Sequence, residues 1–146
     1  MIVYLDASAL VKRYVGEAGS LEVNALLAPV AVAGTSVISR AEVAAAISKA
    51  VRVGVLNREE AKSAFQVFTL DWENLARLQM TEVLAARAAT LAWEHGLRGY
   101  DAVHLAAALT WQEMLGEPVV LATFDRQLWQ GAKTAGLTPW PESQSN

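Results

Sequence analysis

The first ten residues, MIVYLDASAL (1–10), decide the fold. Residues 2–5 are a short, continuous apolar run, which is typical of a strand buried on both faces of a parallel sheet. Asp6 follows this run directly, so it is expected at the carboxyl end of the strand, where open parallel sheets form their sites. The segment has no basic lead and no cleavage site, which argues against a signal peptide.

Similar apolar runs recur along the chain and alternate with stretches of helical period. The predicted strands are Ile2–Leu5, Val30–Ala33, Ala76–Met80, Val119–Ala122 and a short last one near Leu137–Trp140. Helix starts are indicated by a capping box at Asn57 and Glu60 and by Thr81. Predicted helix ends are Gly54, Gly96, Gly116 and Gly136. This alternation predicts an α/β fold, a three-layer α/β/α sandwich with a mainly parallel sheet of four to five strands.

Length and composition predict one domain, residues 1–140, followed by a short polar tail, residues 141–146, that is expected to fray. Hydrophobic residues make up 53% of the 146 residues and charged residues 18%, which excludes a disordered chain, and no apolar run is long enough to span a membrane. The absence of cysteine excludes disulfides, thiolate zinc sites and a cysteine nucleophile. We expect a cytoplasmic protein. A net charge of −3 argues against a general high-affinity RNA binder.

Four acidic residues stand out by their surroundings. Asp125 follows the predicted strand Val119–Ala122 after two residues. It is therefore expected at the same edge of the sheet as Asp6, the edge formed by the carboxyl ends of the strands, which we call the rim. Glu42 and Asp101 lie near the starts of two helices made of small apolar residues, SRAEVAAAI and GYDAVHLAAA, where a buried carboxylate needs a partner. Each Asp could instead be a helix N-cap, whereas Glu is a poor N-cap. Four acids on one rim would repel one another without a cation.

The ligand types indicate which cation would suit such a rim. With carboxylates, no cysteine and only two histidines, the chain favours Mg²⁺ or Mn²⁺ over zinc. Sites of this kind serve phosphoryl chemistry, in which the metal activates water and offsets charge on the departing oxygen. The sequence therefore predicts a metal-dependent enzyme with catalytic and metal-binding acids at Asp6, Glu42, Asp101 and Asp125.

Four segments, MIVYLDASALVKRYV, SRAEVAAAI, GYDAVHLAAA and ATFDRQL, resemble in order and spacing the signature segments of PIN-domain ribonucleases, and in particular the VapC-type toxins. The resemblance runs from residue 2 to about residue 140. It implies a PIN-like fold and a Mg²⁺- or Mn²⁺-dependent endoribonuclease that cleaves RNA phosphodiesters with metal-activated water. It also implies a small antitoxin that blocks the active site, and a homodimer.

The family pattern implies roles for individual residues. Asp6 and Asp101 would be direct metal ligands, and the other two acids, Glu42 and Asp125, would complete the site. Ser8 matches the family's small hydroxyl or amide residue two positions after the first acid and would hold Asp6 or a bound water, and Thr123 occupies a position that often carries a hydroxyl group.

Several residues near the acidic segments have two interpretations. Lys12, Arg13, Arg40 and Arg98 flank these segments and could contact RNA phosphates, or they could be solvated surface charges. A general-base role is conceivable for His104, which follows Asp101 by three residues. A hydrogen-bonded core position is more typical of a histidine in an Ala- and Leu-rich helix, so we interpret His104 in this way.

Alternative functions remain open at this point. One is an RNA-processing PIN nuclease without a toxin role, and another is a non-catalytic α/β domain. A phosphatase of the haloacid dehalogenase type would require a second Asp where the chain has Ser8, and a receiver domain would require a lysine at a strand end.

Overall fold

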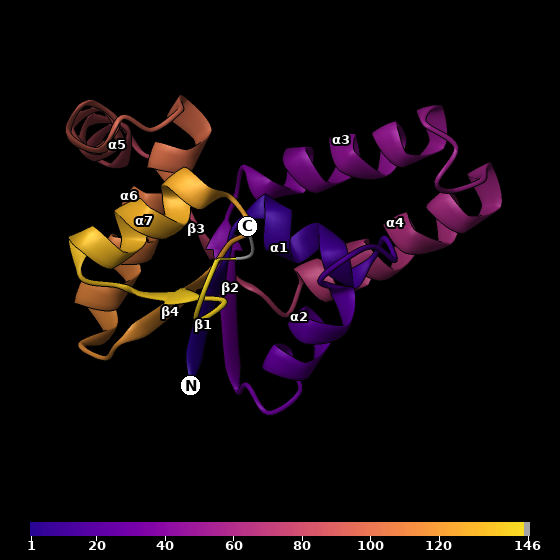
Figure 1. Ribbon diagram of the computed structural model, residues 1–146, viewed down its shortest axis with the longest axis horizontal. Helices are drawn as coiled ribbons and strands as arrows, with labels where there is room; N and C mark the ends of the chain where they lie inside the picture. Colours follow the sequence, from indigo (N-terminus) through magenta and orange to yellow (C-terminus); the bar gives the residue numbers. More distant parts are fainter. Residues whose placement is uncertain (145–146) are drawn as a thin grey trace.

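The computed structural model describes residues 1–144, and in this part of the chain five parallel strands form one sheet in the order β3-β2-β1-β4-β5 (Figure 1). The strands are β1 (Ile2–Leu5), β2 (Val32–Ser36), β3 (Ala76–Leu78), β4 (Val119–Ala122) and β5 (Thr138–Trp140). The central strand β1 pairs with β4 so that Leu5 lies opposite Ala122. The register brings the residues that follow β1 and β4 together, and the backbone N–H of Asp6 donates to the Ala122 carbonyl at 3.2 Å.

Helices cover both faces of this sheet, which confirms the predicted α/β/α sandwich. They are α1 (Ala7–Leu10), the 3₁₀ helix η1 (Val11–Arg13), α2 (Ser20–Leu27), α3 (Ser39–Arg52), α4 (Arg58–Trp72), α5 (Glu82–His95), α6 (Gly99–Leu115) and α7 (Arg126–Ala135). Figure 1 shows α5 to α7 on one side of the sheet and α1 to α4 on the other. Because side chains alternate along a strand, Tyr4 packs with the first group of helices, and Val3 and Leu5 pack with the second.

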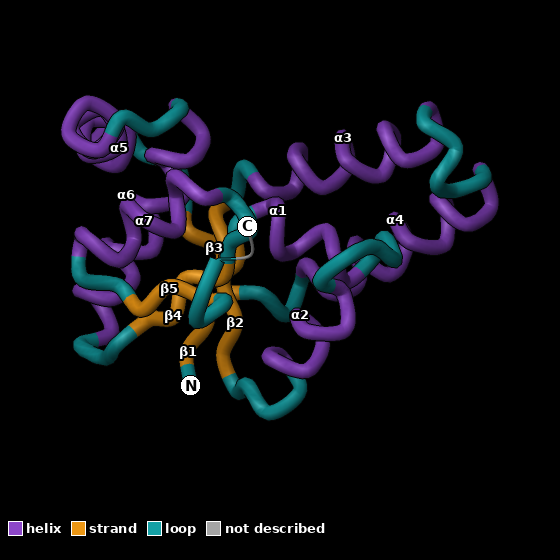
Figure 2. The backbone as a smooth tube through the Cα atoms, in the orientation of Figure 1, coloured by secondary structure: helices purple, strands orange, loops and turns teal. Residues whose placement is uncertain are grey.

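The predicted helix boundaries are confirmed where a capping group marks them. Asn57 and Glu60 form the capping box that begins α4, and Thr81 caps α5. Gly96, Gly116 and Gly136 end α5, α6 and α7 with positive φ angles. Figure 2 shows α3 and α4 running together as an arm that extends away from the strands.

Strand β2 differs most from the sequence-based prediction, which ended it at Ala33. The strand begins two residues later, at Val32, and continues to Ser36. Its polar end is buried because its hydroxyl groups have partners: Thr35 donates to the Leu5 carbonyl at 2.6 Å and lies 2.7 Å from the Ser39 hydroxyl. A search for apolar runs therefore misses the half of the strand that lies nearest to the rim.

The beginning of the predicted tail is attached to the domain. The indole N–H of Trp129 donates to the Pro141 carbonyl at 2.6 Å, and the Gln144 amide donates to the Arg126 carbonyl at 2.9 Å. Residues 141 and 144 thus contact α7, residues 145–146 lie outside the described part of the chain, and the expected fraying of the tail stays a prediction. Among the helices of residues 1–144, none combines the length and apolar character needed to cross a membrane.

Candidate active site

Asp6 lies buried between the end of β1 and the start of α1. One carboxylate oxygen caps α1 by accepting the Ala9 N–H at 3.0 Å and also accepts the Ser8 hydroxyl at 2.7 Å. The other accepts the Thr123 hydroxyl at 2.5 Å. Burial raises the pKa of Asp6 above its ordinary value, although these hydrogen bonds and the nearby His104 lower it in part. The N-cap interpretation is confirmed for Asp6, and Ser8 and Thr123 hold its carboxylate as the family pattern implied.

Asp125 is reached from β4 through Thr123 and Phe124. One of its oxygens caps α7 by accepting the Leu128 N–H at 2.9 Å, so the N-cap interpretation is confirmed here too. Its backbone N–H donates to the Thr123 hydroxyl at 3.0 Å. Thr123 therefore links Asp125 to Asp6, because its hydroxyl accepts from the first residue and donates to the second.

Asp101 lies in the first turn of α6, but Arg98 occupies the N-cap position, so the N-cap alternative is wrong for Asp101. The Asp101 carboxylate accepts the Arg98 Nε–H at 3.0 Å, and the same guanidinium donates to Asp125 at 2.6 Å. Burial raises the pKa of Asp101 above its ordinary value, and the charge of Asp125 raises it further, while the Arg98 hydrogen bond opposes both. Arg98 therefore bridges two of the four acids.

Glu42 lies in the first turn of α3 and is held from the opposite side of the sheet. Its Oε1 lies 2.8 Å from His104 Nε2, and His104 Nδ1 lies 2.8 Å from the Tyr4 hydroxyl. His104 is 1% exposed, which confirms that it is a hydrogen-bonded core residue. An open pocket of about 230 Å³ is lined by Glu42, Arg98, Tyr100 and Asp101.

The four acids share one rim of the sheet but do not form a ready-made metal cage. Among residues 1–144, no three His, Asp or Glu side chains are arranged so that they could enclose a metal ion. Arg98 neutralises one pair, Asp101 and Asp125, and His104 holds Glu42. The donor set is nevertheless the one that Mg²⁺ and Mn²⁺ prefer, and burial raises the pKa of both Asp6 and Asp101, so a bound cation would favour their ionised forms. Their metal-binding and catalytic roles stay predictions.

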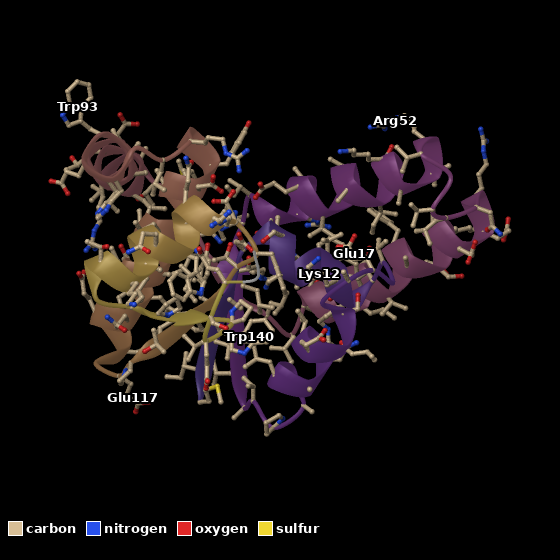
Figure 3. All side chains as sticks on the ribbon, in the orientation of Figure 1. Lys12, Glu17, Arg52, Trp93, Glu117 and Trp140 are labelled. Atoms are coloured by element: carbon tan, nitrogen blue, oxygen red, sulfur yellow. The ribbon has the colours of Figure 1, made fainter. Side chains whose placement is uncertain are left out.

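The basic residues that the sequence suggested as RNA contacts each have a partner in the structure. Lys12 pairs with Glu17 at 3.1 Å, and Figure 3 labels the two side chains near each other. The Lys12 ammonium lies 4.5 Å from the centre of the Phe124 ring, and Phe124 precedes Asp125 in the chain. Arg13 pairs with Asp71 at 3.8 Å, and Arg40 lies over the Trp72 ring. Both are thus held by α4 residues.

Arg98 is the cation that contacts the acids directly, and sequence reasoning did not include it in the site. The available signal was its spacing of three residues before Asp101, which places the two side chains on one face of a helix start. The contact with Asp125 gave no such signal, because it depends on how α6 and α7 pack together.

Comparisons with known proteins identify the family of this chain. The family model described as "PIN domain" matches residues 3–133. Ribonuclease VapC45 of Mycobacterium tuberculosis is 38% identical over 141 residues, which cover 96% of this chain and 95% of that protein. Two solved structures are similar in fold: a toxin–antitoxin complex from Klebsiella pneumoniae (TM-score 0.65, 16% identity, 98% and 99% of the two chains) and FitAcB from Neisseria gonorrhoeae (TM-score 0.66, 18% identity, 97% and 98%). With a family match over most of its length and a relative this similar, the chain belongs to the PIN domain family.

Proposed function

We propose that this protein is a metal-dependent endoribonuclease and the toxin of a toxin–antitoxin pair. The observation that carries the proposal is the rim itself, where Asp6, Glu42, Asp101 and Asp125 are each held by specific hydrogen bonds at the carboxyl ends of β1 and β4 or on the first turns of α3 and α6. The 38% identity to a protein named as a ribonuclease, over nearly the whole chain, supports RNA as the substrate.

In this proposal Asp6 and Asp101 bind Mg²⁺ or Mn²⁺, and Glu42 and Asp125 complete the site. The metal supplies a more acidic water and offsets charge on the departing oxygen. The chain's own contribution is to fix the acids. Ser8 and Thr123 fix the orientation of the Asp6 carboxylate through hydroxyl donors on both of its oxygens.

Arg98 has a separate part in the proposal. Its guanidinium lies where a cation balances Asp101 and Asp125, and its side chain is 71% exposed, so it can leave this position without unpacking the core. Once released, it lies at the pocket edge where it can contact an RNA phosphate with a planar pair of donors. Among the basic residues it is therefore a better candidate for this contact than Arg13 or Arg40, which are held by α4.

The proposed partner is a small antitoxin that presents a cationic side chain to the same acids. Arg98 supports this part of the proposal, because it demonstrates that the rim accommodates a guanidinium between two carboxylates. The similar solved structures include one that is named as a toxin–antitoxin complex. A homodimer, and action in the cytoplasm on cellular RNA, complete the proposal.

The decisive experiment is RNA cleavage by the purified protein with and without Mg²⁺ or Mn²⁺. We expect cleavage that EDTA abolishes and added metal restores, and we expect Asp101→Asn to lower the rate by about 100-fold or more, since the metal's contribution is worth several kcal/mol. Glu117→Gln is the matched control, because it also removes one negative charge but lies in the exposed turn before β4, at the far end of the sheet (Figure 3). Full activity of Asp101→Asn, or cleavage that persists in EDTA, would contradict the proposed mechanism.

The toxin role has its own test. Expression of the protein alone should slow bacterial growth, and the Asp101→Asn variant at the same level should not. Growth that is unaffected by a wild-type protein with measurable nuclease activity would favour the alternative of an RNA-processing nuclease.

A further inference from the structure

A buried tyrosine and a buried histidine connect the core to Glu42. Tyr4 is 0% exposed and His104 is 1% exposed, and their rings meet edge to face with centroids 5.8 Å apart. The Tyr4 hydroxyl lies 2.8 Å from His104 Nδ1, and His104 Nε2 lies 2.8 Å from Glu42 Oε1. Three residues from β1, α6 and α3 thus form one continuous chain of hydrogen bonds that ends at the candidate active site.

The direction of these hydrogen bonds follows from the chemistry of the groups. An ionised carboxylate can only accept, so the hydrogen between His104 and Glu42 must lie on Nε2. In the neutral form of the imidazole Nδ1 is bare and accepts from the Tyr4 hydroxyl. The Tyr4 hydroxyl is fully buried and lies 2.8 Å from Nδ1, so it is the donor of this hydrogen bond. Each group in the chain is therefore an effective donor to the next.

The surroundings of His104 are apolar, so hydrophobic packing does not explain why a polar ring is buried there. Its neighbours in α6 are buried apolar residues, among them Val103, Leu105 and Ala108, and the helix packs into the core on that face of the sheet. A polar ring in such a position costs free energy unless both nitrogens are paired. Tyr4 satisfies one nitrogen and Glu42 the other, so both nitrogens are paired and the imidazole meets the candidate site through this carboxylate.

We propose that Tyr4 and His104 are positioning residues that orient Glu42 for metal binding. The hydrogen bond with His104 engages Oε1, which leaves Oε2 available to a metal in the pocket that Glu42 lines together with Asp101. Outer partners of this kind fix the orientation and basicity of a ligand, and their loss commonly lowers metal affinity by about 10- to 100-fold. This inference rests on the proposed function, because it assigns a role to residues that act through one of its metal ligands.

The test measures Mn²⁺ affinity by calorimetry and does not depend on RNA cleavage. His104→Leu keeps a similar volume and removes the donor, whereas His104→Gln keeps an N–H near the position of Nε2. We expect His104→Leu to weaken Mn²⁺ binding by about 10- to 100-fold, and His104→Gln to restore most of it. Tyr4→Phe should weaken binding less, because it frees the imidazole without removing the bond to Glu42. In cleavage assays these variants should lower kcat more than they raise KM.

A double-mutant cycle with Glu42→Gln separates positioning from a general structural effect. If His104 acts through Glu42, then His104→Leu should change the Mn²⁺ affinity little once Glu42→Gln is present. An equal loss in both backgrounds, or unchanged affinity in a folded His104→Leu or Tyr4→Phe variant, would overturn the inference and leave the proposed function intact. A wild-type protein that binds no Mn²⁺ would overturn both. Melting curves identify any variant that fails to fold. If His104→Leu does not fold, the same cycle is measured with Tyr4→Phe, which removes a single oxygen.

Discussion

Replacing Asp125 by two different residues should separate its capping role from its role in catalysis. Asp125 caps α7 through one oxygen and pairs with Arg98 through the other. Asparagine keeps an oxygen that can accept the Leu128 N–H, but it removes the charge. Alanine removes both. Because Asn and Asp are about equally good N-caps, Asp125→Asn should keep the helix start that Asp125→Ala loses.

The magnitude of the difference follows from the cap alone, since both variants lose the ion pair. Loss of a Ser, Thr, Asn or Asp cap typically costs about 1 kcal/mol. In a domain of this size, that should lower the melting temperature of Asp125→Ala by roughly 2 to 4 °C relative to Asp125→Asn. The effect should appear in full, because α7 covers the edge of the sheet with Leu128 and Ala132, which are both 0% exposed, and unfolds with the core.

The assay compares melting temperature with RNA cleavage in the same preparations. We expect the two variants to differ in stability but to lose cleavage alike, since both remove the negative charge that helps to hold the metal. Equal melting temperatures would refute the capping argument. Full cleavage by Asp125→Asn would refute the catalytic assignment and leave Asp125 as a helix cap only.

Two further predictions concern the charges at the rim. Arg98→Met should strengthen Mn²⁺ binding in calorimetry, because it removes a cation that competes with the metal for Asp101 and Asp125. The control Arg87→Met breaks the ion pair with Glu113 and should leave the Mn²⁺ affinity unchanged. Equal effects of the two variants on the Mn²⁺ affinity would exclude competition. Burial raises the pKa of Asp6 above its ordinary 3.8, so ionisation destabilises the metal-free fold, and the stabilising contribution of protonated Asp6 is lost as the pH rises from about 4 through the raised pKa. In EDTA, Asp6→Asn should therefore gain stability over the wild type as the pH increases, measured by urea unfolding, and a gain that shrinks with pH would contradict this sign.

The sequence was sufficient for the architecture because the deciding signals are local. The apolar run of β1, the capping box at Asn57 and Glu60, and the glycines at the helix ends each act within a few residues. The rim positions of Asp6 and Asp125 then follow because each residue comes just after a parallel strand, and the carboxyl ends of such strands lie at one edge of the sheet. They can be predicted without knowledge of any tertiary contact. The predicted bounds of β2 were wrong because the strand ends with Thr35 and Ser36, polar residues whose burial depends on partners elsewhere in the chain.

The contacts that organise the site were beyond such reasoning because they join distant elements. Tyr4 and His104 are 100 residues apart, and they meet only because α6 packs on the face of β1 that Tyr4 occupies. Arg98 reaches Asp125 across 27 residues through the packing of α6 and α7. No periodicity or spacing in the chain encodes either pair. The sequence therefore identifies which acids lie on the rim and, through the resemblance, Ser8 and Thr123 beside Asp6, but not the partners Arg98, His104 and Tyr4.

Capping and metal binding, which the sequence presents as alternatives, are compatible in this structure because a carboxylate has two oxygens. Asp125 caps α7 with one oxygen and turns the other to the rim, where Arg98 binds it. In Glu42, too, one oxygen has a structural partner, since His104 holds Oε1, and the other oxygen stays available for the site. In Asp6 both oxygens accept hydrogen bonds, yet each has lone pairs beyond those that the cap and the two hydroxyls use. The hydrogen bonds that stabilise the helix starts thus also fix the direction in which each acid faces the rim, so a cap at such a position is no evidence against a role in the site.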